Sequence, residues 1–200
     1  RIWVDDITLT ETVLPRFTDV SAGEGFNDEP AFARAADGSL YAAWVSFRNG
    51  RDTLQLARFT REGADWKRAG GWTVETPAPA YVLQPRLVAT RDGVALLAAC
   101  EAKGNWDVHA RFCGPAGPGR TVTVGSDAAT DVKPAAAVAP DGRLWVAWES
   151  NRDGKRRIFA ASVTGDGRVA PAEALSDASF NACDPDIAVG AAGAVHVAWH

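Results

Sequence analysis

Apolar and polar residues alternate along most of the chain, and pairs of alternating runs flank a Gly. In the stretch 140–163, PDGRLWVAWESNRDGKRRIFAASV, one Asp-Gly pair precedes an alternating run and a second Asp-Gly pair separates it from the next. Alternation with a period of two residues is typical of half-buried strands, and Asp-Gly between such runs favours a tight hairpin turn. The pattern therefore predicts an all-β chain of short antiparallel strands.

This pattern occurs four times, and each copy begins with a polar residue followed by Pro. Eight residues after the Pro stands a Gly in every copy, and fourteen residues after it stands a Trp in three copies and Ala99 in the other. Repeats of about 50 residues with four strands each predict the blades of a β-propeller. The Trp side chains are expected to fill the space between neighbouring sheets. The copies begin at Glu29, Gln84, Lys133 and Asp184.

The repeats predict one β-propeller domain over residues 1–200. The ends of the chain resemble complementary halves of a blade, and a blade shared between them would leave no sheet edge exposed. Three whole blades and one composite blade can form a four-bladed ring. The alternative, less favoured, is part of a larger ring, whose other blades are missing or come from another chain. The predicted boundaries are 1–27 and 183–200 for the composite blade and 28–82, 83–131 and 132–182 for the whole blades.

The charge and the cysteines exclude several classes of partner. The formal net charge is −4 and basic residues are interspersed with acidic ones, so no nucleic-acid partner is expected. No apolar run reaches the roughly 18 residues of a membrane span. The three cysteines lack a C-x-x-C spacing, which favours buried thiols over zinc or disulfides. Because a signal peptide could have been removed before Arg1, we expect a bacterial extracytoplasmic protein, periplasmic or secreted.

The search for catalytic motifs finds no nucleophile elbow, phosphate loop or dinucleotide fingerprint. Two of the three histidines, His109 and His196, lie in alternating runs, and none has ligand spacing with another. Tyr41 also falls in a strand, where a role in the core is expected. The sequence therefore predicts no catalytic residue, no metal ligand and no cofactor.

Ligand-binding residues are expected on the loops at one end of the propeller. The loops that enter each blade and those that join its middle strands meet there around the channel, and a rigid scaffold positions loop residues for binding. Their polar groups and aromatic rings suit a sugar or a peptide. The predicted binding residues are Asp28, Glu29, Arg48, Tyr81, Asn105, Trp106, Asp107, Asp131, Asn151, Arg152 and Asp184.

The repeat unit resembles known propeller families. PDGRLWVAWESNRDGKRRIFAASVTGDGR is similar to repeats of the Tol-system periplasmic protein and of the non-catalytic propeller domains of prolyl-oligopeptidase-type peptidases. DIAVGAAGAVHVAW and PAAAVAPDGRLWVAW resemble sialidase-like propeller repeats. The sialidase Asp-box, Ser-x-Asp-x-Gly-x-x-Trp, is missing from the sequence, so no sialidase residue is carried over. Such a resemblance implies a scaffold and not a particular reaction.

The repeats and the lack of a catalytic motif favour a non-catalytic binding or scaffold propeller that recognises protein or carbohydrate at the loop face. One alternative is a sialidase-like glycoside hydrolase with paired carboxylates. Another is the propeller domain of a larger hydrolase. Whether the chain is an enzyme stays open, and the sequence favours a negative answer. The candidate carboxylates are those of Asp28, Glu29, Asp107, Asp131 and Asp184.

Overall fold

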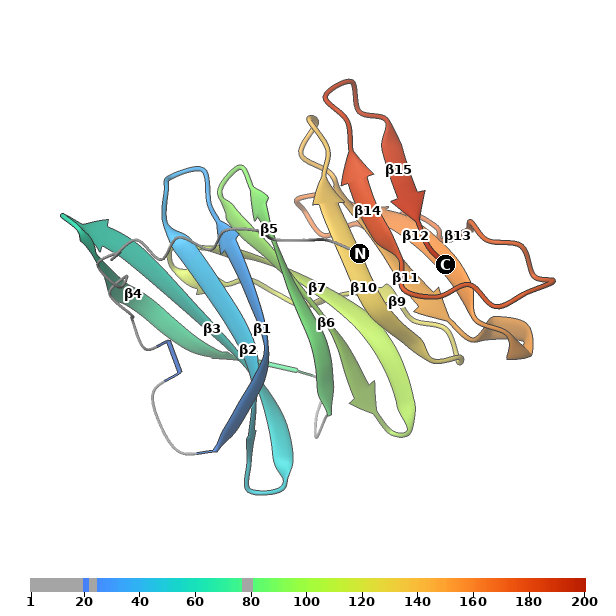
Figure 1. Cartoon of the computed structure of the whole chain (residues 1–200), viewed down its shortest axis with the longest axis horizontal. Helices are drawn as coiled ribbons and strands as arrows, with labels where there is room; N and C mark the ends of the chain where they lie inside the picture. The colour runs from blue at the N-terminus through green and yellow to red at the C-terminus, as the bar shows by residue number, and fades with distance from the viewer. Residues whose placement is uncertain (1–19, 22–24, 77–80) are drawn as a thin grey trace, which may run out of the picture.

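The structure is a computed structural model that describes residues 20–21, 25–76 and 81–200. Within these ranges the chain is all-β, and its one helical element is the 3₁₀ turn η1 (Arg152–Gly154). The strands form antiparallel sheets that follow one another along the chain (Figure 1). The prediction of an all-β propeller with four-stranded antiparallel blades is confirmed.

Each of the first three sheets is built from consecutive strands. The first contains β1 (Phe26–Arg34), β2 (Leu40–Arg48), β3 (Arg51–Glu62) and β4 (Asp65–Val74). The second contains β5 (Val82–Thr90), β6 (Gly93–Ala102) and β7 (Asn105–Gly114), with β8 (Gly117–Pro118) and β9 (Val122–Gly125) both pairing with β7. The third contains β10 (Asp131–Val138), β11 (Leu144–Ser150), β12 (Arg157–Val163) and β13 (Glu173–Ala174). The last is the hairpin of β14 (Asp186–Val189) and β15 (Val195–Ala198).

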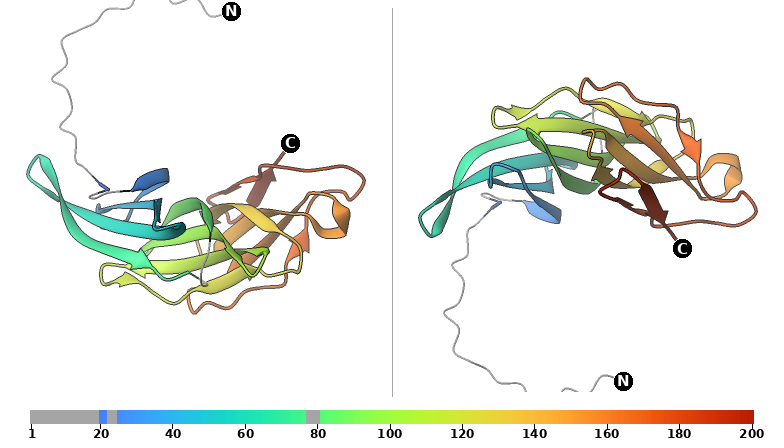
Figure 2. Two further views of the ribbon diagram at one scale, coloured as in Figure 1. Left: turned by 90° about the horizontal axis from the view of Figure 1, so that it is seen from below. Right: turned by 90° about the horizontal axis from the view of Figure 1, so that it is seen from above.

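The first strands of the sheets lie side by side as an inner row. β1 contacts β5, β5 contacts β10, and β10 contacts β14. The sheets follow one another along an arc (Figure 2). The predicted contribution of residues 1–27 to the composite blade falls largely outside the described residues, so the closure of a ring stays a prediction.

Three of the first hairpins share one turn geometry. Residues Arg34 and Leu40 pair across a five-residue connection in the first sheet, and the third and last sheets have connections of the same length. Gly38 in this turn has a φ of 83°, a left-handed conformation that Gly adopts at no steric cost. The Asp-Gly pattern therefore specifies the hairpins through local turn geometry.

The second sheet departs from the ungapped repeat. Its first hairpin has a two-residue turn between Thr90 and Gly93. Counted from the repeat Pro, each residue of β5 pairs with a residue of β6 that lies one position earlier than in the first sheet. Phe32 pairs with Ala42 in the first sheet, and the equivalent Leu87 pairs with Leu96 in the second. The position of Trp44 consequently falls on Ala98, and the expected equivalence with Ala99 was wrong by one residue.

Apolar side chains fill the spaces between consecutive sheets. Trp148 of β11 is fully buried in the cluster between the second and third sheets, and its ring lies 6.2 Å from that of Phe159. Tyr41 is fully buried between the first and second sheets. Both side chains therefore have the packing role that the sequence predicts for them.

The first sheet exposes the face that points away from β5. Phe32 on this face is 62% exposed, whereas its equivalents Leu87 and Ile187 are each 8% exposed and pack against the preceding sheet. Trp44 and Phe59 form a separate apolar cluster on the same face. In the described part of the chain, no sheet covers this face, whereas a preceding sheet covers the equivalent face of the second and last sheets.

Candidate functional site

The connections between the second and third strands of a sheet lie at the same end of the molecule as the segments that enter the sheets. In Figure 1 the turns between the first and second strands of each sheet lie toward the top, and the connections between β2 and β3 and between β6 and β7 lie at the bottom. Side chains of two middle-strand connections, one in the second sheet and one in the third, bond to the segment that enters the third sheet. Asn105 Nδ2 donates to Asp127 O at 2.8 Å, and Asn151 Oδ1 accepts from the Thr130 N–H at 2.8 Å. The structure thus brings the expected loops together.

A left-handed residue occurs at the same place in every sheet. The residue before each repeat Pro has a φ between 48° and 56°, although none of the four is Gly. The register of the inner strand shifts at this point in the first three sheets. Non-Gly residues adopt this conformation at an energetic cost, and such residues concentrate at functional sites. We call these residues the left-handed row: Glu29, Gln84, Lys133 and Asp184.

Side chains of the left-handed row bond to the backbone of the next sheet. The Glu29 carboxylate accepts the N–H of Gln84, and the Gln84 side-chain oxygen accepts the N–H of Lys133 at 2.8 Å. The Lys133 ammonium cannot accept a hydrogen bond. In its place the carboxylate of Glu149, on β11, accepts the N–H of Asp184 at 3.3 Å. These bonds link all four sheets at the inner row.

A charged cluster lies where Lys133 interrupts this series. The Lys133 Nζ atom lies 2.6 Å from Asp184 Oδ1 and 3.4 Å from Glu149 Oε2. These two carboxylate oxygens are therefore at most about 6 Å apart, the sum of the two distances. Arg156 Nε lies 3.4 Å from the other Glu149 oxygen, and His200 Nε2 lies 3.5 Å from the other Asp184 oxygen. We call Glu149 and Asp184 the carboxylate pair.

Burial and charge differ within this cluster. The Glu149 side chain is 5% exposed, whereas that of Asp184 is 52% exposed. The hydrogen bond from Lys133 lowers the pKa of the Asp184 carboxyl below its ordinary value. The same hydrogen bond raises the pKa of Lys133. At neutral pH the cluster therefore presents an ionised, accessible Asp184 beside a charged Lys133.

Three of the predicted binding residues hold loops in place. Asp131 is fully buried, and its Oδ2 atom lies 3.5 Å from Arg152 Nη2 and accepts the N–H of Asp127 at 3.3 Å. The Arg152 guanidinium also lies 4.1 Å from the centre of the Phe159 ring. Asn151 binds the same connecting loop through the Thr130 N–H. These contacts give Asp131, Asn151 and Arg152 a structural role at the loop end.

Asn105, Trp106 and Asp107 stand together at the start of β7 and are half-buried. Asn105 Nδ2 lies 3.2 Å from Asp107 Oδ1. Burial raises the pKa of the Asp107 carboxyl, and the nearby charge of Asp131 raises it further. This carboxyl is thus near the loop contacts of Asp131 and belongs to a different group of residues from the carboxylate pair.

Of the remaining predicted residues, Asp28 and Arg48 lie on the first sheet and Tyr81 directly precedes β5 of the second sheet, where its carbonyl accepts the N–H of Glu101. Asp28, Arg48 and Tyr81 are exposed. Asp28 lines a hollow of about 130 Å³ together with Phe32 and Trp44, on the uncovered face of the first sheet. The last two of the eleven predicted residues, Glu29 and Asp184, belong to the left-handed row.

Gln84, Lys133 and Glu149 are not among the predicted binding residues. For the first two a signal exists, because the residue before each repeat Pro is long or charged and polar in all four copies. Glu149 has no such signal, because the equivalent residue of the first sheet is the buried Val45. Its contact with Asp184 joins residues 35 positions apart.

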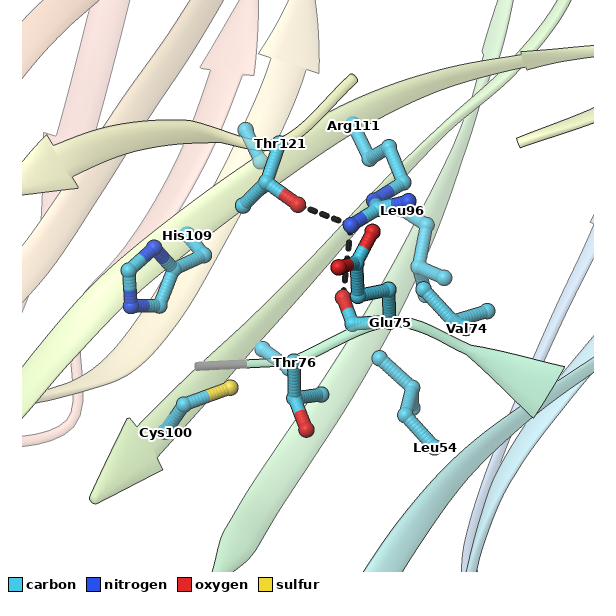
Figure 3. Close-up of a pocket in the computed structure, with 11 residues that line it drawn as sticks. Leu54, Val74, Glu75, Thr76, Leu96, Cys100, His109, Arg111 and Thr121 are labelled. Carbon is cyan, nitrogen blue, oxygen red and sulfur yellow. Dashed lines mark hydrogen bonds between the residues drawn. The ribbon is translucent and has the colours of Figure 1, made fainter. Parts of the chain in front are cut away.

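A small cavity between the first and second sheets also contains polar groups (Figure 3). Arg111 donates to Glu75 O at 2.5 Å and to the Thr121 hydroxyl. Burial, and then the charge of Arg111, lowers the pKa of His109 to about 4, and burial raises that of Cys100 to about 12. The cavity volume of about 20 Å³ accommodates one water molecule. It is too small for a sugar or a peptide.

Two further observations concern the described residues only. They contain no group of three or more His, Cys, Asp or Glu side chains that could hold a metal ion. They also contain no helix that is long and apolar enough to cross a membrane.

Comparison with solved structures finds the same fold in carbohydrate-active enzymes, although no protein-family model and no curated protein matches the sequence. An endo-arabinase from Bacteroides thetaiotaomicron is 16% identical with a TM-score of 0.57, over 92% of this chain and 74% of that one. An α-L-arabinanase from Penicillium chrysogenum, complexed with arabinobiose, is 13% identical with a TM-score of 0.60, over 85% and 58%. A GH93 α-L-arabinofuranosidase from Fusarium graminearum, also with arabinobiose, is 13% identical with a TM-score of 0.60, over 82% and 53%. The chain thus spans little more than half the length of the two fungal enzymes.

These similarities correct the first functional expectation. The structures that share the fold are arabinanases and an arabinofuranosidase, which contradicts the expectation of a non-catalytic scaffold. Membership of the propeller fold is supported at the same time. The three enzymes are neither Tol-system proteins nor sialidases, so those finer resemblances stay predictions.

Proposed function

We propose that this chain is the propeller of a glycoside hydrolase that cleaves an arabinose-containing glycan at the carboxylate pair. The observation that supports the proposal most directly is the separation of Glu149 and Asp184, at most about 6 Å between the two oxygens that share Lys133. Glycoside hydrolases use two carboxyl groups, roughly 5 to 5.5 Å apart for retention and 6.5 to 9.5 Å for inversion. The folds of the arabinan-cleaving enzymes support the substrate class.

The two carboxyl groups have different roles in this proposal. Asp184 is ionised and half-exposed, which suits it to attack the anomeric carbon or to activate a water. Glu149 lies farther from the Lys133 ammonium, at 3.4 Å against 2.6 Å for Asp184. In this proposal Glu149 is the general acid, which donates a proton to the oxygen of the departing sugar. Such a division between two carboxyls follows from their different surroundings.

A neutral sugar fits the charges of the left-handed row. The row and the carboxylate pair contain three acidic side chains, Glu29, Glu149 and Asp184, against two cations, Lys133 and the neighbouring Arg156. Sugars that carry a carboxylate would be repelled by this excess of negative charge. Arabinose carries no charge, and its hydroxyl groups can bond to the carboxylates and to Gln84.

Hydrolysis assays test this proposal. Purified protein is incubated with arabinan, arabinobiose and a nitrophenyl arabinofuranoside, and new reducing ends or nitrophenolate are measured. We expect turnover, and a loss of about 10² to 10⁴-fold in kcat for Glu149→Gln and Asp184→Asn. The matched control is Asp141→Asn, at an exposed turn, with unchanged turnover expected. Lack of turnover on every arabinoside, or full activity in both variants, contradicts the proposal.

A polysaccharide substrate also bears on location. Glycan polymers are too large and too polar to cross a membrane unaided, so we place the protein outside the cytoplasm, in the periplasm or secreted. Cell fractionation with an antibody against this domain tests the location, and recovery with the cytosolic fraction contradicts it.

A further inference from the structure

We infer that Lys133 is the positioning residue that holds Asp184 and Glu149 in working geometry, an inference that rests on the proposed function. Lys133 touches both carboxylates and belongs to neither of the elements that carry them. It lies on β10, whereas Glu149 lies on β11 and Asp184 precedes β14. One ammonium group thus determines how two carboxyl groups from different elements face each other.

The backbone of Lys133 is itself fixed from the other side. Its φ is 54°, it lies at the register shift between Val132 and Ala135, and its N–H donates to Gln84 Oε1 at 2.8 Å. The second sheet therefore fixes the main chain of Lys133, and its side chain reaches the third and last sheets. A lysine anchored in this way has fewer accessible positions than one on a free loop.

Its side chain is also shielded from solvent, being 30% exposed. Ion pairs weaken as their exposure to water increases. The other groups near the pair are Arg156 beside Glu149, His200 beside Asp184, and Cys183, whose Sγ atom lies 3.7 Å from Arg156 Nη1. The side chains of Arg156 and His200 are both mostly exposed. Lys133 is therefore the cation that water screens least.

Removal of the ammonium leaves two carboxylates within about 6 Å of each other with no shielded cation between them. Asp184, which is half-exposed, then loses its shortest ion pair and can rotate away from Glu149. A displacement of about 1 Å in a catalytic group costs about a hundredfold in rate. The loss of the positive charge also makes Asp184 bind a proton more readily, so the acidic limb of the pH profile moves to higher pH.

The test compares Lys133→Met with Lys133→Arg, which retains the charge, and with Lys67→Met as a control at an exposed position on β4. Two readouts are used: kcat/KM across pH with the nitrophenyl arabinofuranoside, and titration of the Asp184 side-chain carboxyl by ¹³C NMR. Lys133→Gln replaces the Met variant should that variant fail to fold.

For Lys133→Met we expect about a hundredfold lower kcat/KM, with both the acidic limb and the NMR midpoint of Asp184 at higher pH. Lys133→Arg is expected to restore the NMR midpoint, and Lys67→Met to match the wild type. An unchanged Asp184 midpoint in folded Lys133→Met overturns the inference. The NMR titration needs no turnover, so it decides the role of Lys133 even if the wild-type protein hydrolyses none of the glycosides.

Discussion

The uncovered face of the first sheet gives a prediction that compares two equivalent residues. Leu87 and Phe32 occupy the same repeat position, but the first is 8% exposed against a neighbouring sheet and the second is 62% exposed. We expect Leu87→Ala to reduce the free energy of unfolding by about 2 to 5 kcal/mol, because it opens a cavity between two sheets. Phe32→Ala should cost about 1 kcal/mol or less, because little of its apolar area leaves water on folding.

The assay is urea unfolding followed by the fluorescence of the eight Trp side chains. Stability differences are taken from the midpoint at an unchanged dependence on urea concentration. A control substitution is Leu97→Ala, fully buried on the opposite face of the second sheet, which should cost as much as Leu87→Ala. Equal and large costs for Phe32→Ala and Leu87→Ala would refute the reasoning. They would mean that another sheet covers Phe32 in solution.

Three further predictions concern buried polar groups. Asp131→Ala should lower stability by about 3 to 5 kcal/mol in urea unfolding, because it breaks a buried ion pair; a loss below 1 kcal/mol counts against the structural role. The pKa of His109 is lowered to about 4 from an ordinary value of 6.5, so the unfolded chain binds the extra proton and stability falls as pH drops from 6.5 to 4. His109→Gln should reduce this fall, measured from urea midpoints at several pH values, and an unchanged pH dependence contradicts the assignment. A thiol reagent at pH 8 should modify Cys183 in the native protein, and Cys100 and Cys113 only after unfolding. The reason is that burial raises the thiol pKa of Cys100 and of Cys113 to about 12. Rapid labelling of all three thiols in the native protein contradicts this.

The strand pairs could be predicted from the sequence because their turns depend on local chemistry. Asp37-Gly38 and Asp141-Gly142 specify hairpins through residues that are adjacent in the chain. The error at Ala99 has the same origin. The shortened turn before Gly93 keeps its Asp-Gly pair, so the sequence shows no gap where the register changes by one residue.

The candidate cluster could be predicted only in part, because its contacts join distant segments. Asp184 was a candidate as a loop carboxylate, but its partner Lys133 lies 51 positions away. Polar loop residues such as Arg152 were expected to face a ligand. Whether a loop side chain binds a neighbouring loop or a ligand depends on how the sheets pack, and alternation along one strand contains no information about that.

The hydrogen bonds that the N–H groups of Gln84 and Lys133 donate to the Glu29 and Gln84 side chains join the sheets at their innermost strands, and this has a mechanical consequence. Because the sheets are joined at their inner strands, they can move apart by distances that increase toward their outer strands. Atoms of the inner strands move least, and the hydrogen bond from the Asp184 N–H to the Glu149 carboxylate holds Asp184 beside them. The outer strands β4 and β13 can therefore fluctuate while the carboxyl groups keep their spacing.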